Sequence, residues 1–204
     1  TAVQALPVII PVALITGSML IVQFSQLSGQ VDLGKLLVVL VLREIGPLIT
    51  AIIVILRSAT AVTIEMSYMC VLHEIDALEM AGIDPLHTVC FPRLVGITTA
   101  IVSLILVFDL VAIIGGYAIV KGTTILPVEG FFQQIAKGVV GTDIAVGILK
   151  GAFFGVTITV TCLYHGLARK NQITQVPVAT SRAAVDCFFY CLVINIFISF
   201  IFYV

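Results

Sequence analysis

Long apolar stretches alternate with short polar segments along this chain. Five stretches are apolar enough to be helices inside a membrane, and they cover roughly residues 5–24, 34–64, 94–120, 141–164 and 183–204. A helix needs about 20 apolar residues to cross the hydrocarbon of a bilayer, so each stretch predicts one transmembrane helix. The second stretch exceeds that length and contains Gly46-Pro47, where we expect the helix to kink or break.

The most polar segment lies between the second and third stretches, at residues 65–93. Its central part holds four of the eleven acidic residues and no Lys or Arg: Glu74, Asp76, Glu79 and Asp84. Apolar and acidic positions alternate at helical spacing, which predicts a short amphipathic helix ending near Gly82, with Asp84-Pro85 as a turn. Such a helix is exposed at one face of the membrane. There the helix either contacts a soluble partner or is only a solvent-exposed loop that connects two spans.

Composition supports a membrane protein. The chain has 204 residues, of which 60% are hydrophobic and only 10% are charged. A soluble domain of this size could not cover so much apolar surface. Unbroken apolar runs differ from the alternating pattern of a membrane barrel, so we predict an all-α integral membrane protein with one domain over 1–204. The net charge of −1 gives no reason to expect nucleic acid as a partner.

With five spans, the polar segment and the connection at 165–182 lie on the same side of the membrane. The basic residues on that side are Arg93, Arg169, Lys170 and Arg182, and those on the other side are Lys35, Lys121 and Lys137. This small excess of positive charge predicts that the polar segment is cytoplasmic.

Several charged residues lie within the apolar stretches, where charge is costly unless it is paired or faces a cavity or the interface. Arg43 and Glu44 are adjacent and point in different directions on a helix, so we expect each to have a partner elsewhere, or the pair to anchor the helix at the membrane surface. Arg57 is expected near the cytoplasmic end of the same span. Asp109 is the most isolated charge, and it has two interpretations. It either forms a structural ion pair with Arg57, Arg43 or Lys150, which we favour, or it faces a water-filled cavity.

Small residues predict close helix packing in the fourth stretch. Gly147, Gly151 and Gly155 recur every four residues and form one smooth stripe. Lys150 lies beside this stripe, and we expect it to extend toward the interface. Cys187 and Cys191 lie one helical turn apart in an apolar run, which favours small core residues over a disulfide or a metal site.

No catalytic set emerges from the remaining polar residues. The serines lack the context of an activated nucleophile, the three histidines do not form a metal-binding motif, and no phosphate-binding glycine loop is present. We therefore expect no catalytic residue, metal or cofactor in this chain. An intramembrane hydrolase that uses His165 and a serine is possible, but the spacing of these residues in the sequence does not support it.

Taken together, the motifs between residues 43 and 93 resemble the MlaE/YrbE permease family. The resemblance rests on Arg-Glu-Ile-Gly-Pro at 43–47, Arg-Ser-Ala-Thr-Ala at 57–61, Ile64-Glu65, Met69, residues 74–80, Asp84-Pro85 and Pro92-Arg93. A weaker likeness extends to the C-terminus. These permeases are membrane subunits of ABC transporters that work with MCE proteins, and the TGD permease is their chloroplast relative.

The resemblance implies a homodimer with five spans in each copy and a cytoplasmic coupling helix. An amphipathic elbow helix precedes the first span in the family, and we expect it to be missing here. ATP and Mg would be bound by a separate cytoplasmic ATPase, and an MCE hexamer would lie on the opposite face. The substrate would be phospholipid, moved between the inner and outer membranes of a bacterium. The alternative location is the chloroplast inner envelope.

The resemblance also implies roles for single residues. Glu74, Asp76 and Glu79 would bind basic residues of the ATPase, and Leu78 and Met80 would be apolar anchors. Asp84-Pro85 would fix the exit of the coupling helix. The first, second and fifth spans would line a lipid cavity, with Arg43 or Lys35 as a headgroup contact.

Two further function classes remain open. One is a stand-alone channel or ion-coupled carrier with Asp109 as its ion site. The other is a protein that only serves as a scaffold.

Overall fold

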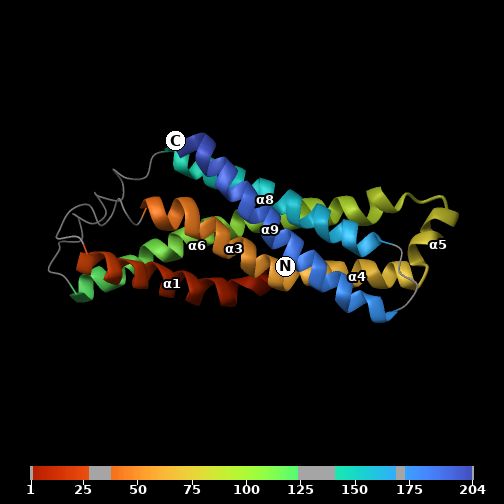
Figure 1. The fold of residues 1–204 in the computed structure, drawn as a ribbon, viewed down its shortest axis with the longest axis horizontal. Coiled ribbons are helices and arrows are strands. Elements are labelled where there is room, and N and C mark those ends of the chain that lie inside the picture. Colours follow the sequence, from red (N-terminus) through yellow and green to blue (C-terminus); the bar gives the residue numbers. More distant parts are fainter. Residues whose placement is uncertain (1, 28–37, 124–140, 169–172, 204) are drawn as a thin grey trace.

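The structure is a computed structural model that describes residues 2–27, 38–123, 141–168 and 173–203. The α-helices among these residues are α1 (Ala2–Leu27), α3 (Gly46–Val54), α4 (Thr60–Val71), α5 (Glu74–Met80), α6 (Phe91–Thr123), α8 (Gly141–Leu167) and α9 (Val176–Tyr203). Shorter segments join them: the π-helical turns η1 (Val38–Ile45), η2 (Ile55–Ala59) and η3 (Leu86–Cys90), and the 3₁₀ turn η4 (Ile173–Gln175). The described part of the chain contains no strand, so the predicted all-α fold is confirmed (Figure 1).

Four helical segments are long and apolar enough to cross a membrane. They are Val41–Val71, Leu86–Gly115, Asp143–Leu167 and Ile173–Phe202, and a shorter apolar helix covers Ala5–Met19. These spans correspond to four of the five predicted ones, and the first span stays a prediction. The protein is an integral membrane protein, because helices of this length and hydropathy have no other stable environment.

The second span stays helical through Gly46-Pro47, where we expected a kink or break. The turn before it, η1, has the wider π-helical hydrogen-bond pattern, and Ile45 keeps helical dihedral angles (φ −72°, ψ −42°). Pro47 has no N–H to donate, and it lies in the first turn of α3, where a missing donor is tolerated. Around Gly46-Pro47, the backbone hydrogen bonds therefore change from the π-helical to the α-helical pattern while the helix itself continues.

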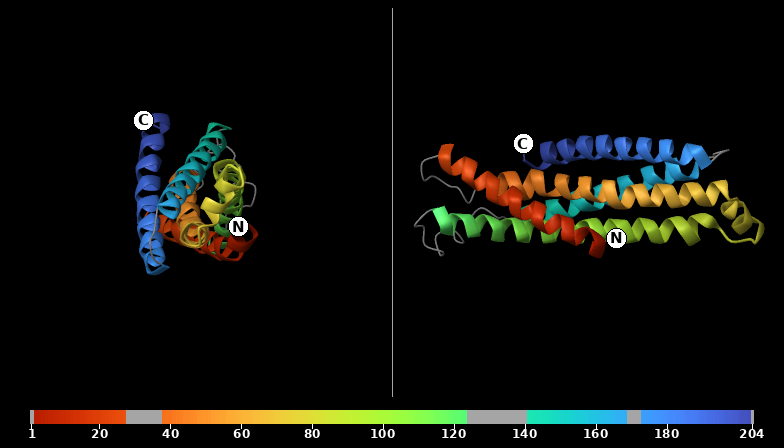
Figure 2. Two further views of the ribbon diagram at one scale, coloured as in Figure 1. Left: turned by 90° about the vertical axis from the view of Figure 1, so that its right-hand side faces the viewer. Right: turned by 90° about the horizontal axis from the view of Figure 1, so that it is seen from below.

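The long helices form an elongated bundle around the second span (Figure 1). α3 contacts α6, α8 and α9, and α4 contacts α8 and α9, while α1 packs along α6 and α3. Figure 1 and the right view of Figure 2 show α5 at one end of this bundle, and the C-terminus lies toward the other end. The C-terminal end of α8 and the N-terminal end of α9 lie at the same end of the bundle as α5, as expected if the polar segment and the 165–182 connection share a side.

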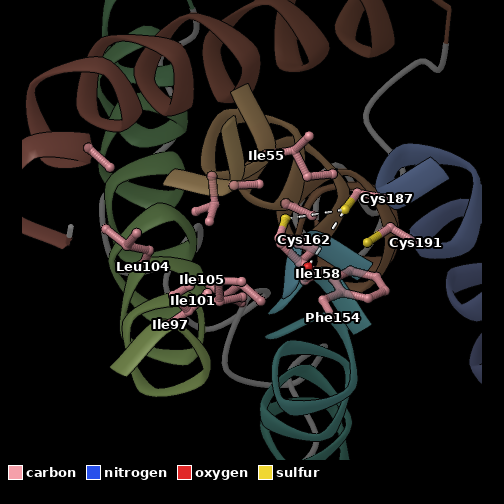
Figure 3. Packing of buried hydrophobic residues seen from close by; sticks show 14 of the residues in the cluster. Ile55, Ile97, Ile101, Leu104, Ile105, Phe154, Ile158, Cys162, Cys187 and Cys191 are labelled. Carbon is pink, nitrogen blue, oxygen red and sulfur yellow. Dashed lines mark hydrogen bonds between the residues drawn. The ribbon is translucent and has the colours of Figure 1, made fainter. Parts of the chain in front are cut away.

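The bundle core is made of branched aliphatic side chains from α6 and a sulfur-containing layer between α8 and α9 (Figure 3). Cys162, Cys187 and Cys191 are fully or almost fully buried and free. The Sγ atoms of Cys162 and Cys187 are 3.7 Å apart, which is a weak hydrogen bond. Cys187 and Cys191 are therefore small core residues, as predicted.

Two of the three glycines in the predicted stripe bring α8 against α6. A Cβ atom on Gly155 would lie 2.5 Å from the backbone Cα of Thr98, and one on Gly151 would lie 3.0 Å from Cδ1 of Ile105. A Cβ atom on Gly147 would meet nothing within 4 Å. Close packing thus needs glycine at 155 and favours it at 151, where the side chain of Ile105 would have to shift, whereas Gly147 borders open space.

This difference predicts the outcome of two alanine substitutions. Gly155→Ala should lower the free energy of unfolding by about 1–3 kcal/mol, because a backbone atom blocks the new methyl group. Gly147→Ala is the matched control and should change it by less than about 0.5 kcal/mol. Denaturant unfolding in detergent would measure both. Equal stability of the two variants would show that this contact is not tight.

Candidate functional site

An ion pair joins the second and fourth spans near the ends of these spans that lie away from α5. Nε of Arg43 lies 3.0 Å from Oδ1 of Asp143, and an Nη atom of Arg43 donates to Oδ2 at 3.1 Å. The Asp143 side chain is only 3% exposed and that of Arg43 is 22% exposed. The Nη bond is a charge-assisted hydrogen bond, and the short distance from Nε to Oδ1 adds electrostatic attraction between the two side chains.

A second polar group lies next to this pair and adds the fifth span. Nζ of Lys150 donates to the carbonyl oxygen of Arg43 at 2.7 Å and to Oγ of Ser199 at 2.7 Å, and it lies 3.4 Å from Oε1 of Glu44. Ser199 donates to Oε1 of Glu44 at 2.6 Å, and Nδ2 of Asn195 donates to Oε2 at 2.9 Å. We call these residues, together with Asp143, the polar network. It connects η1, α8 and α9.

The polar network confirms that Arg43 and Glu44 have separate partners in distant segments. The expectation for Lys150 is wrong: its side chain is 1% exposed and does not extend to the interface. It stays inside because Glu44 and Ser199 offer acceptors within reach, which removes the need for water. Sequence reasoning missed Asp143, Asn195 and Ser199 as partners. Each of the three is an isolated polar residue in an apolar stretch, and this feature of the sequence could have identified them as candidate partners.

Asp109 has a different environment from the other buried charges. It borders a cavity of about 290 Å³ whose other walls include Leu42, Asp143, Ile144 and Gly147. Its Oδ1 atom is buried and has no hydrogen-bond partner in the described part of the chain. The structural ion pair that we favoured is therefore not found among the described residues, where Asp109 lines a cavity instead.

Gly46 is the residue that lets Asp109 approach the second span. A Cβ atom on Gly46 would lie 2.7 Å from Oδ1 of Asp109 and 2.9 Å from the carbonyl oxygen of Val41. Gly46 and Pro47 are both buried, so this part of the predicted site is a packing element next to the cavity.

α5 is held in place by its own ends rather than by burial. His73 precedes it with φ at 58°, a left-handed conformation that is rare outside glycine, and Nδ1 of His73 is 2.8 Å from Oδ2 of Asp76. At the other end, Gly82 has φ at 76°, and the N–H groups of Gly82 and Ile83 donate to the carbonyl oxygens of Glu79 and Leu78 at 3.0 Å each. This is the glycine-based cap predicted near Gly82.

The side chains of α5 divide as the amphipathic pattern predicts. Glu74, Asp76 and Glu79 are exposed, and Met80 is 84% exposed. Leu78 is half-buried, so it is only partly available as an anchor for a partner.

The two residues beyond the cap form the predicted turn. Oδ1 of Asp84 accepts from the N–H of Leu86 at 2.9 Å, and its carbonyl oxygen accepts from Oγ1 of Thr88 at 3.0 Å. Pro85 follows with helical dihedral angles and leads into η3. Asp84 and Pro85 therefore fix the path of the chain from α5 into the third span.

Arg57 lies on the surface of the second span, apart from the polar network. It borders another cavity, between α4 and α6, together with Glu65 and Arg93. Glu65 and Arg93 form an ion pair of 3.0 Å. Lys35, the alternative headgroup contact, lies outside the described residues.

Comparison with known proteins identifies the group to which this architecture belongs. The model of the family described as permease MlaE matches residues 1–201. The chain belongs to the MlaE permease family. It is 30% identical over 192 residues to the intermembrane phospholipid transport system permease protein MlaE of Haemophilus influenzae, covering 90% of this chain and 72% of that protein.

Two further relatives are less similar to this chain. A probable ABC transporter permease protein of Rickettsia conorii is 25% identical over 98% of this chain and 79% of its own length. The chloroplastic protein trigalactosyldiacylglycerol 1 of Arabidopsis thaliana is 24% identical over 80% of this chain and 47% of its own length.

The ionisable residues of this MlaE-family chain do not gather into a metal site where the structure describes them. No group of three His, Cys, Asp or Glu side chains is placed to hold an ion. His165 instead pairs with Asp186, 2.8 Å away on α9. The polar side chains brought together by the fold are arranged to satisfy one another across helices.

The coupling within the polar network can be measured with a double-mutant cycle on this MlaE-family bundle. Glu44→Gln and Lys150→Met should each destabilise the protein, because each leaves a partner group unsatisfied in a water-poor site. The double variant should lose less than the sum of the two, by about 1–3 kcal/mol. Unfolding in detergent gives the three values. Strict additivity would contradict the direct interaction.

Proposed function

We propose that this chain is the membrane permease subunit of an ABC transporter that moves phospholipids between the inner and outer membranes of a cell envelope. The observation that carries this proposal is α5, an exposed acidic helix at one end of the bundle that a short turn joins to the second span. ATP hydrolysis would take place in a partner chain that binds ATP and Mg, so the permease itself would be non-catalytic. The Haemophilus relative's printed name, a phospholipid transport permease, supports the substrate class.

The ATPase would dock on α5 through charge and one apolar anchor. Glu74, Asp76 and Glu79 present carboxylates to solvent, and no residue of α5 is buried. A basic groove would be complementary to these groups and would steer the encounter. Met80 has the exposure and flexibility to fill an apolar pocket at the centre of such an interface.

Movement of α5 would reach the membrane through the second span. The left-handed turn at His73 joins α5 to α4, and the helical backbone then continues through η2 and α3 to Arg43 and Glu44. Closing of the ATPase pair changes the position of α5 only if the closed pair contacts α5 differently from the open pair. The polar network would pass this change to α8 and α9, because the three segments share one set of hydrogen bonds.

The remaining partners follow from the family. The span that contains α9 is only 22% buried within one chain, compared with 50% for the second span. Its exposed surface would therefore contact a second copy of the chain or lipid. An MCE hexamer would lie at the end away from α5. Phospholipid would occupy a cavity lined by the first, second and fifth spans, and the location would be the bacterial inner membrane, or the chloroplast inner envelope as the alternative.

A charge reversal on α5 tests the docking of the ATPase. Glu79→Lys should abolish co-purification of the ATPase, because the charge at this position changes from negative to positive on a surface that must face a basic groove. Gln175→Lys is the matched control, since Gln175 is exposed at the same end of the bundle and lies outside α5. Affinity purification of both variants in mild detergent gives the answer. Normal recovery of the ATPase with Glu79→Lys would remove α5 from the interface.

A second candidate function is a carrier or channel coupled to ions through Asp109. The specific observation in its favour is the buried Oδ1 atom of Asp109, which has no partner among the described residues and borders a cavity.

The two candidates predict different behaviour in vesicles. In the ATP-driven permease, Asp109→Asn should leave lipid transfer within about twofold of the unchanged protein, because the amide has the same shape. In the ion-coupled carrier, the same substitution should abolish a transport activity that needs no ATPase. Proteoliposomes with and without the ATPase separate these outcomes. ATPase-independent transport that is lost in Asp109→Asn would favour the carrier.

A further inference from the structure

Two arginines from different spans face one cavity on the side of the bundle. This cavity measures about 310 Å³ and lies between α4 and α6. Its polar rim is formed by Arg57, Glu65 and Arg93, and its wall includes the apolar side chains of Ala61, Val62 and Ile97. It is separate from the polar network, with which it shares no residue.

The charges around this cavity do not cancel. One Nη atom of Arg93 lies 3.0 Å from Oε2 of Glu65, so the carboxylate neutralises one guanidinium. The other Nη atom of Arg93 is buried and has no hydrogen-bond partner in the described part of the chain. Arg57 is exposed, and the described residues include no carboxylate within ion-pair distance of it. One positive charge and several N–H donors therefore remain available.

The position of this cavity along the second span places it at a membrane surface. The span Val41–Val71 has 31 residues. It exceeds the roughly 20 residues that cross hydrocarbon. Arg57 and Glu65 lie in the half of this span that leads to α5, so the excess length brings both within reach of the membrane surface on the α5 side. An arginine near the end of a span extends its guanidinium to the headgroup layer.

We propose that this cavity binds the phosphate group of a membrane phospholipid from the leaflet on the α5 side. Arg57 and the free Nη atom of Arg93 would donate to the phosphate oxygens, since planar guanidinium groups match phosphate in a bidentate manner. The acyl chains would run along the apolar wall between α4 and α6. A cation fits less well, because the only carboxylate on the rim is already paired with Arg93. A soluble phosphate ester shares the recognised chemistry, and only the lipid also uses the apolar wall.

Native mass spectrometry of the purified chain in mild detergent tests this site with three probes. They are phosphatidylglycerol, a diacylglycerol with the same acyl chains, and glycerol phosphate. Phosphatidylglycerol should bind at least tenfold more tightly than either other probe. Equal binding of the diacylglycerol would overturn phosphate recognition, and equal binding of glycerol phosphate would overturn the lipid as its source.

Substitutions assign that binding to this cavity rather than to another lipid site. Arg57→Gln should weaken phosphatidylglycerol binding roughly tenfold, on the scale of one charge-assisted hydrogen bond, and leave diacylglycerol binding unchanged. Arg182→Gln is the matched control, because Arg182 is exposed on α9 at the same end of the bundle and lies outside the cavity. Equal affinities of Arg57→Gln and Arg182→Gln would contradict the proposal.

A conservative variant keeps the test valid if Arg57→Gln does not fold. Arg57→Lys retains the charge and loses the bidentate geometry, so its affinity should fall between those of the unchanged protein and Arg57→Gln. An unchanged affinity in Arg57→Lys, combined with loss of folding in Arg57→Gln, would also count against the site. The result does not depend on docking of the ATPase, which is measured separately by co-purification.

Discussion

The structure depends on satisfying charged side chains where water is scarce. Lipid chains are as apolar as leucine, so burial of apolar surface gives little drive for helices to associate inside a bilayer. In this chain, Glu44 and Lys150 supply the missing specificity, because each needs partners that only another span can offer. The polar network therefore fixes how the second, fourth and fifth spans face one another. A bundle with another register would leave at least one charge without a partner.

Tight backbone contacts complete this arrangement at other levels of the bundle. Gly155 and Gly151 hold α8 against α6, and Gly17 brings α1 to the backbone of Ala112 at a distance that excludes a Cβ atom. The third span is thus packed between the first and the fourth. Polar bonds at one level and close contacts at others make the transmembrane part a unit, while α5 has no buried residue. This contrast is what a transmitting element requires: a free surface for a partner and a firm connection to the spans.

The second span links these two regions in one helix. Its π-helical turns η1 and η2 lie on either side of α3, and they bring Arg43 and Arg57 into the altered segments. Wider turns inside α-helices often occur at functional positions, where they change the direction in which a side chain points. Here one of them carries Arg43 toward Asp143, and the other carries Arg57 toward a separate cavity.

Local features of the fold could be predicted from the sequence, and distant pairings could not. The end of α5 depends on Gly82 and the turn after it on Asp84, both of which signal their conformation through residue type alone. Lys150 was expected at the interface because its partner Glu44 lies 106 positions earlier, and spacing along one helix does not reveal such a pairing. The glycine stripe had the right period, yet whether a neighbour faces Gly147 depends on the course of α6. Among the residues that the structure describes, Asp109 likewise forms no ion pair, and two of its expected partners, Arg43 and Lys150, are bound by Asp143 and Glu44.

The composition of the intact complex tests the central claim that this bundle is driven by a separate ATPase. The measurement is native mass spectrometry of the tagged chain, purified from its own membrane in mild detergent with lipids retained. The account predicts two copies of this chain with two copies of an ATPase, an MCE hexamer and bound phospholipid. A lone oligomer that carries no ATPase would contradict it.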